Sequence, residues 1–369
     1  MFQRIRNLFK WLALLGYGIV LLLYIATLLV AYLGDYWWFP SLLTYGFPFL
    51  TLLLLCFVVY WLLLKRKIPA LAGLLVLLFG WKSLFSIYAF GGSDAPTTER
   101  DSSSIRVLTW NVMRMVGIEG SQEEKNQTKQ KALKLILSQQ PDVICLQEFV
   151  NGAAHTAFSI LPYMKDSAGY PYMVFAPDFE WFDGTIHQGV VIFSRFPILD
   201  SARIRFPAPT TPQSLIYADI QKGKDTFRVY TGHLESFRFS SSDYEDINQA
   251  KKGSVKKVRL IRKVKWATEH RGIQARMIRD EMKKSPYPTI FCGDLNDVPA
   301  SNTYFTVRQD RIDAFLAKGK GLGRTFTRIS PTLRIDHIFA DPAFEVNRVY
   351  RLKQRLSDHY GLVADLKLK

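Results

Sequence analysis

The chain has 369 residues, a net charge of +16 and a hydrophobic content of 48%, enough for a membrane segment and one large domain. Its three cysteines, Cys56, Cys145 and Cys292, are too scattered for a disulfide framework or a zinc-binding pattern, so we expect free thiols. The basic charge favours phosphate esters, nucleic acid or anionic lipid as partners, without choosing among them.

Residues 1–90 are almost wholly apolar and differ from the rest of the chain. Residues 11–33 and 42–64 carry no charge, and each run is long enough to cross a hydrocarbon core of about 30 Å as a helix. Residues 68–90 form a third run, interrupted by Lys82, and Trp37 and Trp38 fall between the first two runs, where interfacial aromatics belong. We therefore predict a membrane segment over residues 1–90 with about three transmembrane helices.

The loop charges predict the orientation of this segment. Basic residues precede the first run and recur at Lys65–Lys67, and such residues favour the cytoplasmic side. Three crossings then place residues 91–369 on the outer, periplasmic or extracellular, face of a bacterial inner or plasma membrane. If Lys82 keeps the third run from crossing, the domain is cytoplasmic instead.

Residues 91–104 are rich in Gly, Ser, Thr and Pro, which is typical of a linker. From residue 105 to 369, short apolar runs alternate with helix-like stretches, as in an α+β or layered sandwich fold. We predict helices at 123–139 and 269–284, and strands at 105–110, 142–148, 189–195, 215–220, 226–234, 287–295 and 334–341.

Polar residues recur where these strands end. They are Asn111, Glu148, His233, Asp294, Asn296, Asp336, Asp358 and His359. One polar residue at a strand end is usually a cap or turn former, but a set restricted to Asn, Asp, Glu and His predicts a site at one rim of a sheet.

Seven short segments carry a family resemblance. TWNV, LQE, FSRFPI, TGHLES, GDLN, RIDHIF and SDH occur in that order from about residue 105 to the C-terminus. The chain thus resembles the endonuclease/exonuclease/phosphatase superfamily, which includes DNase I-like nucleases, inositol polyphosphate phosphatases and neutral sphingomyelinases. The resemblance implies a four-layered α/β sandwich, with two central sheets flanked by helices, here preceded by the transmembrane segment.

The resemblance also implies a metal site. Glu148 corresponds to the principal metal ligand, with Asn111 beside it and Asp358 as a further ligand, directly or through water. These hard oxygen donors suit Mg²⁺ or Mn²⁺ better than zinc.

The remaining site residues correspond to catalytic positions of the family. Asp294 is implied to activate the attacking water, and Asn296 to position that water or the phosphate. His359, paired with Asp336, is implied to steady the phosphate or the transition state, and its part as base, acid or electrostatic donor stays open. His233 corresponds to a histidine near the phosphate oxygens or the leaving group, and no covalent enzyme intermediate is implied.

Other residues have plainer interpretations. We expect His337 to be structural, because it points away from Asp336 on a strand. We expect His155 and His270 to be ordinary surface or capping residues, Glu235 to form a salt bridge or a cap, and Ser194 to make a structural hydrogen bond. His187 has two interpretations, a residue at the edge of the cleft or one with no part in it. The basic segment 251–265 predicts a helix that is either a solvated surface element or a contact for anionic lipid headgroups or a polyanionic substrate.

These observations predict a membrane-anchored, Mg²⁺-dependent (or Mn²⁺-dependent) hydrolase of phosphodiester or phosphomonoester bonds, with the lipid bilayer as a partner. The alternative is a membrane-tethered binding module of the same fold without catalysis. Within the hydrolase prediction the substrate is open: nucleic acid, a lipid headgroup or a small phosphate ester.

Overall fold

The structure, a computed structural model, describes residues 2–33, 38–92, 95–96, 99–115, 122–152, 159–210, 213–240, 243 and 254–369. Predictions for Trp37 and His155 lie outside this part of the chain.

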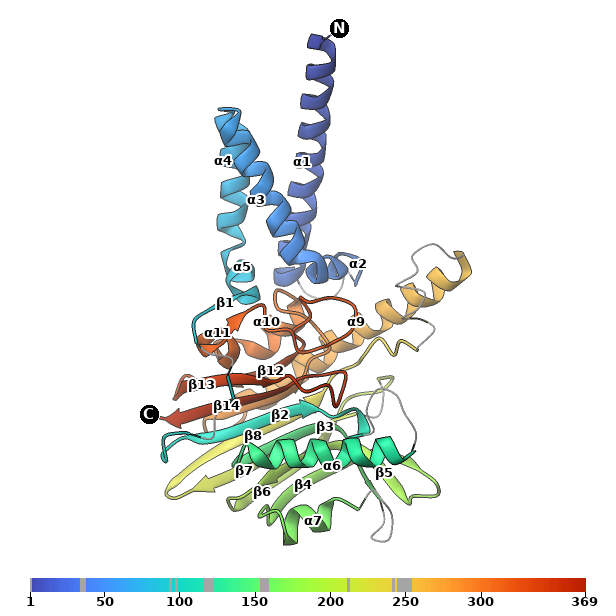
Figure 1. Ribbon diagram of the computed structural model, residues 1–369, viewed down its shortest axis with the longest axis vertical. Coiled ribbons are helices and arrows are strands. Elements are labelled where there is room, and N and C mark those ends of the chain that lie inside the picture. The colour runs from blue at the N-terminus through green and yellow to red at the C-terminus, as the bar shows by residue number, and fades with distance from the viewer. Residues whose placement is uncertain are drawn as a thin grey trace.

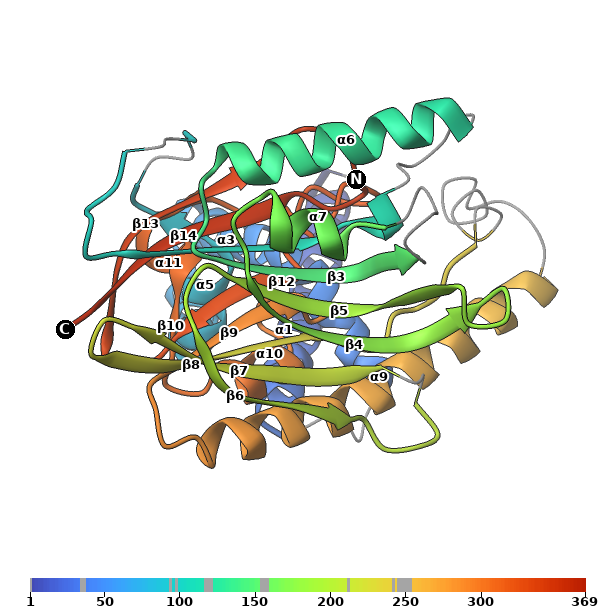
Figure 2. The same ribbon diagram turned by 90° about the horizontal axis from the view of Figure 1, so that it is seen from below.

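Two six-stranded sheets lie face to face at the centre of the C-terminal domain (Figures 1 and 2). The first contains, in spatial order, β13 (Phe344–Leu352), β14 (Gly361–Leu368), β2 (Ile105–Asn111), β3 (Val143–Gly152), β5 (Ile186–Ser194) and β4 (Tyr172–Trp181). The second contains β10 (Ile312–Asp313), β12 (Asp336–Ala340), β9 (Thr289–Asp294), β8 (Asp225–His233), β7 (Ser214–Lys222) and β6 (Ile198–Arg205).

Helices cover the outer face of each sheet. The first sheet packs against α6 (Gln122–Ser138) and α7 (Leu161–Asp166), and the second against α9 (Ser254–Lys283) and α10 (Asn302–Arg308). One apolar cluster fills the space between the sheets, so all seven residues of β2 are buried. A strand covered on both faces has no solvent side, so β2 is mainly apolar, and its one charged residue, Arg106, is paired with Asp365 at 2.6 Å. The four-layered sandwich is therefore confirmed.

The N-terminal helices stand on one side of this sandwich (Figure 1). They are α1 (Phe2–Leu33), α2 (Trp38–Ser41), the 3₁₀ helix η1 (Leu42–Gly46), α3 (Phe47–Leu63), α4 (Lys67–Phe79) and α5 (Trp81–Ile87). Two stretches, Gln3–Ala31 and Trp38–Leu63, are long and apolar enough to cross a membrane. The predicted first two crossings thus have matching helices.

The third predicted run is not one straight helix. Helices α4 and α5 meet at Gly80 with a bend of 69°, so together they form one further span at most. A Cβ at Gly80 would come within about 3.0 Å of Tyr24, so close packing against α1 favours glycine at the break. Lys82 lies in α5 and lines a cavity with Arg308 of the domain, at the domain end of this run rather than at the centre of a span.

The membrane segment packs directly on the domain. Strand β1 (Ala89–Phe90) pairs with β11 (Lys320–Gly321), which precedes the loop leading to β12 and follows α11 (Ala314–Lys318). The Arg334 side chain donates to the Ser86 carbonyl at 2.6 Å, and Asn302 donates to the Ala31 carbonyl at 3.3 Å. These contacts hold the helices in place in addition to the predicted linker at 91–104.

Candidate active site

The topology gathers the predicted site residues at one end of the two sheets. Strands β2 and β3 are parallel, as are β8 and β9, so the carboxyl ends within each pair lie together. Asn111, His233 and Asp294 are the last residues of β2, β8 and β9. Asp336 begins β12, directly opposite Asp294 in the antiparallel ladder.

A cavity of about 520 Å³ lies above these strand ends. It is lined by Asn111, Glu148, His233, Asp294, Asn296, Asp358 and His359. Asp336 is the one predicted site residue outside the lining, and it contacts the cavity through His359. The structure thus brings all eight predicted residues together, while their individual roles stay predictions.

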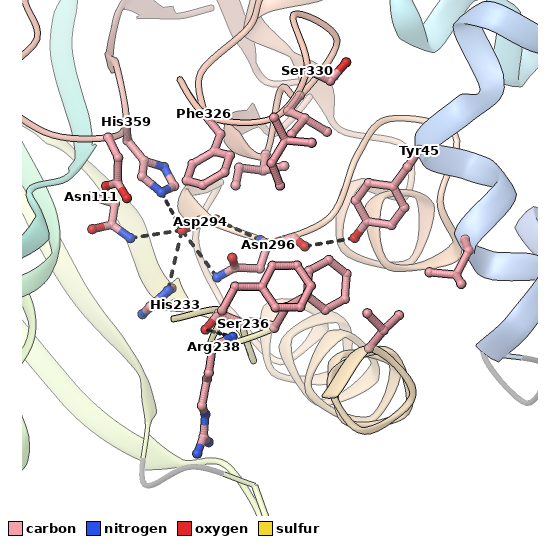
Figure 3. A pocket seen from close by; sticks show the side chains of 18 of the residues that line it. Tyr45, Asn111, His233, Ser236, Arg238, Asp294, Asn296, Phe326, Ser330 and His359 are labelled. Atoms are coloured by element: carbon pink, nitrogen blue, oxygen red, sulfur yellow. Dashed lines mark hydrogen bonds and ion pairs between the residues drawn. The ribbon is translucent and has the colours of Figure 1, made fainter. Parts of the chain in front are cut away.

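Asp294 is the centre of the cluster (Figure 3). Its Oδ2 accepts from the Asn111 side-chain amide at 3.0 Å and lies 3.5 Å from His233 Nε2 and 3.8 Å from His359 Nε2. Its Oδ1 accepts from the Asn296 backbone at 2.8 Å. Burial raises the pKa of Asp294 to about 6, helped by the nearby charge of Asp336 and opposed by the two histidines and Asn111.

His359 forms an ion pair with Asp336. The distance from Nδ1 to Asp336 Oδ2 is 2.8 Å, and both side chains are buried. Burial alone would lower the pKa of His359, but the charges of Asp336 and Asp294 outweigh it and raise that pKa to about 10. His359 is therefore an imidazolium at neutral pH, as the predicted pairing with Asp336 implies.

His233 is oriented by a residue that the sequence analysis missed. The side-chain amide of Gln213 lies 3.1 Å from His233 Nδ1. The other ring nitrogen of His233, Nε2, faces Asp294 Oδ2 at 3.5 Å. Gln213 precedes β7 in a loop, and no pattern in the sequence singles it out.

Glu148 lies in a β-bulge. The pairing of β3 with β5 shifts register between Leu146 and Phe149, and Glu148 adopts a left-handed backbone with φ of +51°. Such a conformation costs a non-glycine residue of the order of 1–3 kcal/mol and recurs at functional sites. The bulge turns the Glu148 carboxylate into the cavity, where it is 27% exposed.

The carboxylate oxygens of the cavity fit a hard divalent cation. Glu148 and Asp358 expose 27% and 17% of their side chains, and both line the cavity, with Arg328 3.7 Å from Asp358 Oδ2. Asn111 donates to the Glu148 carboxylate at 3.2 Å, so its oxygen becomes a ligand only if the amide turns over. A second close group, Asp294, Asp336 and His359, has ligand atoms within 4.8 Å of one another, and within it His359 Nδ1 is bonded to Asp336 Oδ2.

The loop after β9 is held from two directions. Asn296 has a φ of +51°, and its carbonyl accepts from the Arg271 side chain and from the Tyr45 hydroxyl, the latter at 3.2 Å. Tyr45 belongs to η1 of the membrane segment (Figure 3). Because 251 residues separate Tyr45 from Asn296, no local sequence pattern indicates this contact.

Two other histidines lie away from the cluster. His337 is buried between Tyr304 and Phe339, with ring centroids 5.1 Å apart in each pair, and this confirms its structural role. Burial lowers its pKa to about 3, with help from Arg334. His187 lies 3.6 Å from Glu180 and does not line the cavity.

The remaining single-residue predictions have mixed outcomes. His270 is buried and stacked on Trp266 at 3.9 Å, so the expectation of a surface position was wrong; the helix packs this ring against its own preceding turn. Glu235 pairs with Arg238 at 2.6 Å, and the Ser194 hydroxyl bonds to the Phe196 carbonyl at 2.8 Å, both as expected. All three cysteines are free thiols, as predicted.

The basic segment 251–265 enters helix α9. Arg259 and Lys263 bind the carboxylate of buried Asp243 at 2.6 and 2.7 Å, and their charges help to hold the pKa of Asp243 well below its usual value. Val264 lines the cavity. Part of the positive charge of this segment is therefore neutralised by Asp243 within the protein.

Comparisons with known proteins agree with this architecture. The sequence profile of the endonuclease/exonuclease/phosphatase family matches residues 108–359. A second profile, described as a domain of unknown function, matches residues 8–87. The comparison with curated proteins gave no match.

Solved structures share the fold at low identity. An endonuclease/exonuclease/phosphatase from Beutenbergia cavernae DSM 12333 is 22% identical, with a TM-score of 0.52 over 72% of each chain. The human Nocturnin catalytic domain with bound sulfate is 22% identical, with a TM-score of 0.51 over 72% of this chain and 95% of that one. A humanized D. rerio TDP2 is 19% identical, with a TM-score of 0.51 over 72% of this chain and 100% of that one. The chain therefore belongs to the endonuclease/exonuclease/phosphatase family.

Proposed function

We propose that this protein is a membrane-anchored hydrolase that cleaves phosphodiester or phosphomonoester bonds with water and a divalent cation, Mg²⁺ or Mn²⁺. One observation carries the proposal: a buried carboxylate, Asp294, is surrounded by Asn111, His233, Asn296 and His359 at the floor of a cavity. Such a cluster can hold water and an anionic phosphate close together.

Glu148 and Asp358 would hold the cation, with Asn111 beside them. When bound, it supplies positive charge that offsets the negative charge gathering on the phosphate oxygens. The strained backbone at Glu148 supports this assignment, because it turns a hard oxygen ligand toward the cavity at an energetic cost.

Asp294 takes the proton of the attacking water. Its pKa of about 6 is higher than that of an ordinary carboxylate, so it is a stronger base that is still ionised at neutral pH. The water oxygen forms a bond to phosphorus and the bond from phosphorus to the ester oxygen breaks. The leaving oxygen takes a proton from solvent, and Asp294 returns the water proton to solvent, so the alcohol and the phosphate are released and Asp294 is ionised again. Asn296, fixed by its backbone bond to Asp294, orients the water or the phosphate.

The two histidines provide donors for the phosphate. His359 carries a positive charge held by Asp336 and steadies the phosphate oxygens as charge builds up. His233 directs its Nε2 toward the same space and interacts with the phosphate oxygens or the leaving group. Because a buried carboxylate and two histidines converge on the cavity, catalysis explains the site better than a binding module without turnover does.

The orientation in the membrane follows the three-crossing arrangement. Helix α1 runs toward the domain, α3 runs away from it, and α4 and α5 return (Figure 1). The N-terminus and Lys65–Lys67 therefore lie at the end far from the domain, which supports a cytoplasmic location for these basic residues and an outer-face location for the site, in a bacterial inner or plasma membrane.

Turnover of bis(4-nitrophenyl) phosphate by the full-length protein in detergent tests the proposal. We expect Mg²⁺ to support release of 4-nitrophenol, EDTA to abolish it, and added Mg²⁺ to restore it. Glu148→Ala should remove the metal-dependent rate, whereas Glu180→Ala, at a 62% exposed glutamate on β4, should not. Full activity in EDTA would overturn the metal assignment.

A further inference from the structure

The cavity has two chemically different ends. The catalytic cluster forms one end, and Leu42, Tyr45 and Phe49 of the membrane segment form part of the other. These three residues belong to the candidate span Trp38–Leu63, at its end nearest the domain. One wall of the site is therefore made by the membrane segment itself.

The walls between these ends are mainly apolar. The domain contributes Phe237, Phe239, Phe326 and Ile329, and the rings of Phe237 and Phe239 are stacked with centroids 5.2 Å apart. Among the described residues that line the cavity, Arg238 alone is a lysine or arginine, and its guanidinium is bonded to Glu235.

Two large apolar side chains of the lining remain exposed. Phe49 is 55% and Ile329 is 53% exposed, and they approach the cavity from the membrane segment and from the domain. Ile329 also has a φ of +65°, which is a rare and strained conformation for a β-branched residue. The fold thus holds an isoleucine at the cavity in a strained conformation and leaves it uncovered by the described part of the chain.

We propose that this cavity binds a phosphate ester with a long hydrocarbon chain, a lipid delivered from the bilayer. The inference rests on the proposed hydrolysis and names its substrate class. The phosphate lies against the catalytic cluster, and the chain runs along the apolar walls toward Phe49 and the membrane. A substrate entering from the bilayer reaches the site without its chain crossing water, because the span and the cavity share these residues.

A nucleic-acid strand fits the same walls less well. A single strand is bound by a groove of several lysines or arginines that follows its phosphates, together with aromatic rings that stack on its bases. The cavity offers aromatic rings, but Arg238 is its one such cation among the described lining residues, and Glu235 already offsets that charge. One wall of the cavity is formed by residues of a candidate membrane span.

The test compares two diesters that share a phosphate and a leaving group, ethyl 4-nitrophenyl phosphate and hexadecyl 4-nitrophenyl phosphate. The full-length protein in nanodiscs is assayed with Mg²⁺, and kcat/KM is measured for each ester. Burying one methylene contributes a factor of about four, so burial of a few methylenes predicts a preference of at least tenfold for the hexadecyl ester.

Variants separate binding in the cavity from simple partitioning into the bilayer. Ile329→Asn, and independently Phe49→Ser if the first variant folds poorly, should lower the ratio of hexadecyl to ethyl kcat/KM at least fivefold. Leu199→Asn is the matched control, because Leu199 is 54% exposed on β6 and does not line the cavity. This control should keep the wild-type ratio.

The outcomes distinguish the two proposals. Turnover of both esters with a ratio near one, or a ratio that Ile329→Asn and Phe49→Ser leave unchanged, overturns the lipid inference and leaves the hydrolase intact. A higher kcat/KM for a single-stranded oligodeoxynucleotide than for the hexadecyl ester overturns it in favour of a nuclease. Absence of metal-dependent turnover of every substrate overturns the hydrolase proposal and the lipid inference with it.

Discussion

Replacing Asp336 by asparagine should change the charge of His359 while keeping a side chain of the same shape. In the wild type the pKa of His359 is raised from 6.5 to about 10, a difference worth roughly 5 kcal/mol between its charged and neutral forms. Burial opposes the charged form, so without the Asp336 carboxylate we expect the pKa of His359 to fall well below 10, with the charges of Asp294 and Asp358 still favouring the imidazolium.

The size of the effect on activity follows from this shift. At pH 8 a group with a pKa of 10 is about 99% protonated, and one with a pKa of 6.5 roughly 3%. If the charged form of His359 is required, Asp336→Asn should lose up to about 30-fold in kcat at pH 8, the full loss applying if the pKa returns to 6.5. The ratio of variant to wild-type activity should rise as the pH falls, because His359 in the variant then regains its proton.

The raised pKa of His359 also predicts how the free energy of unfolding depends on pH. Because the pKa of His359 is higher in the folded than in the unfolded protein, its protonation stabilises the fold fully below pH 6.5, and this contribution is lost as the pH rises through 10. The free energy of unfolding of the wild type should therefore fall between pH 6.5 and 10 more steeply than that of Asp336→Asn.

The direct assay is an NMR titration of ring-labelled histidine in the metal-free, detergent-solubilised protein. The chain has only six histidines, and a His359→Gln sample identifies the resonance. Asp200→Asn, at a carboxylate 62% exposed on β6, serves as the control and should not shift it. A His359 that titrates near 6.5 in the wild type, or near 10 in Asp336→Asn, would refute the reasoning.

Three further predictions follow from other parts of the structure. Tyr45→Phe removes the hydrogen bond from the hydroxyl to the Asn296 carbonyl, which is worth about 0.5–1.5 kcal/mol, so kcat should fall roughly twofold to tenfold without loss of folding. An unchanged kcat would mean that the membrane segment does not position this loop. His337 is buried with a pKa of about 3, so the free energy of unfolding should be lower at pH 4 than at pH 7, and His337→Phe should reduce this difference in denaturant titrations. An equal pH dependence in both proteins would contradict a buried, neutral His337. The orientation is tested in a background in which the exposed cysteine, Cys56, is replaced by serine, and a membrane-impermeant maleimide added to intact spheroplasts should label Lys367→Cys but not Arg66→Cys. The reverse pattern would place the domain in the cytoplasm.

Much of the sandwich could be predicted because its central strands have an unusual pattern. β2 and β9 are buried at every position, so each appears as a short, mainly apolar run that ends in a polar residue. β6 was missed because most of its residues are partly or fully exposed and no apolar run marks it. β4 was missed for a related reason: Pro177 and a register shift beside it interrupt a strand that has only one buried residue.

The helices, too, could be predicted only in part. The predicted helix at 269–284 is the second half of α9, which begins at Ser254. Its first half carries many lysines and arginines, and an apolar stripe there could belong to a surface helix or to a membrane contact. The bend at Gly80 depends on contact with Tyr24 of another helix, so the run 68–90 could not reveal it.

The residues that form the site could be predicted more fully than the residues that hold them in position. The polar residues stand out because they end apolar strands, and parallel pairing then brings them together. Gln213 and Tyr45 act through contacts between segments that are distant along the chain, to His233 and to the Asn296 carbonyl. No local pattern encodes such contacts, since they arise only when the layers pack.

The central claim is that metal-dependent attack of water breaks a phosphorus–oxygen bond at Asp294. Hydrolysis of bis(4-nitrophenyl) phosphate in ¹⁸O-labelled water, followed by mass spectrometry, tests it directly with the full-length protein. The account predicts one ¹⁸O atom in the 4-nitrophenyl phosphate product and none in 4-nitrophenol, with product formed in Mg²⁺ but not in EDTA and lost in Asp294→Asn. Label in 4-nitrophenol, or undiminished turnover by Asp294→Asn, would contradict it.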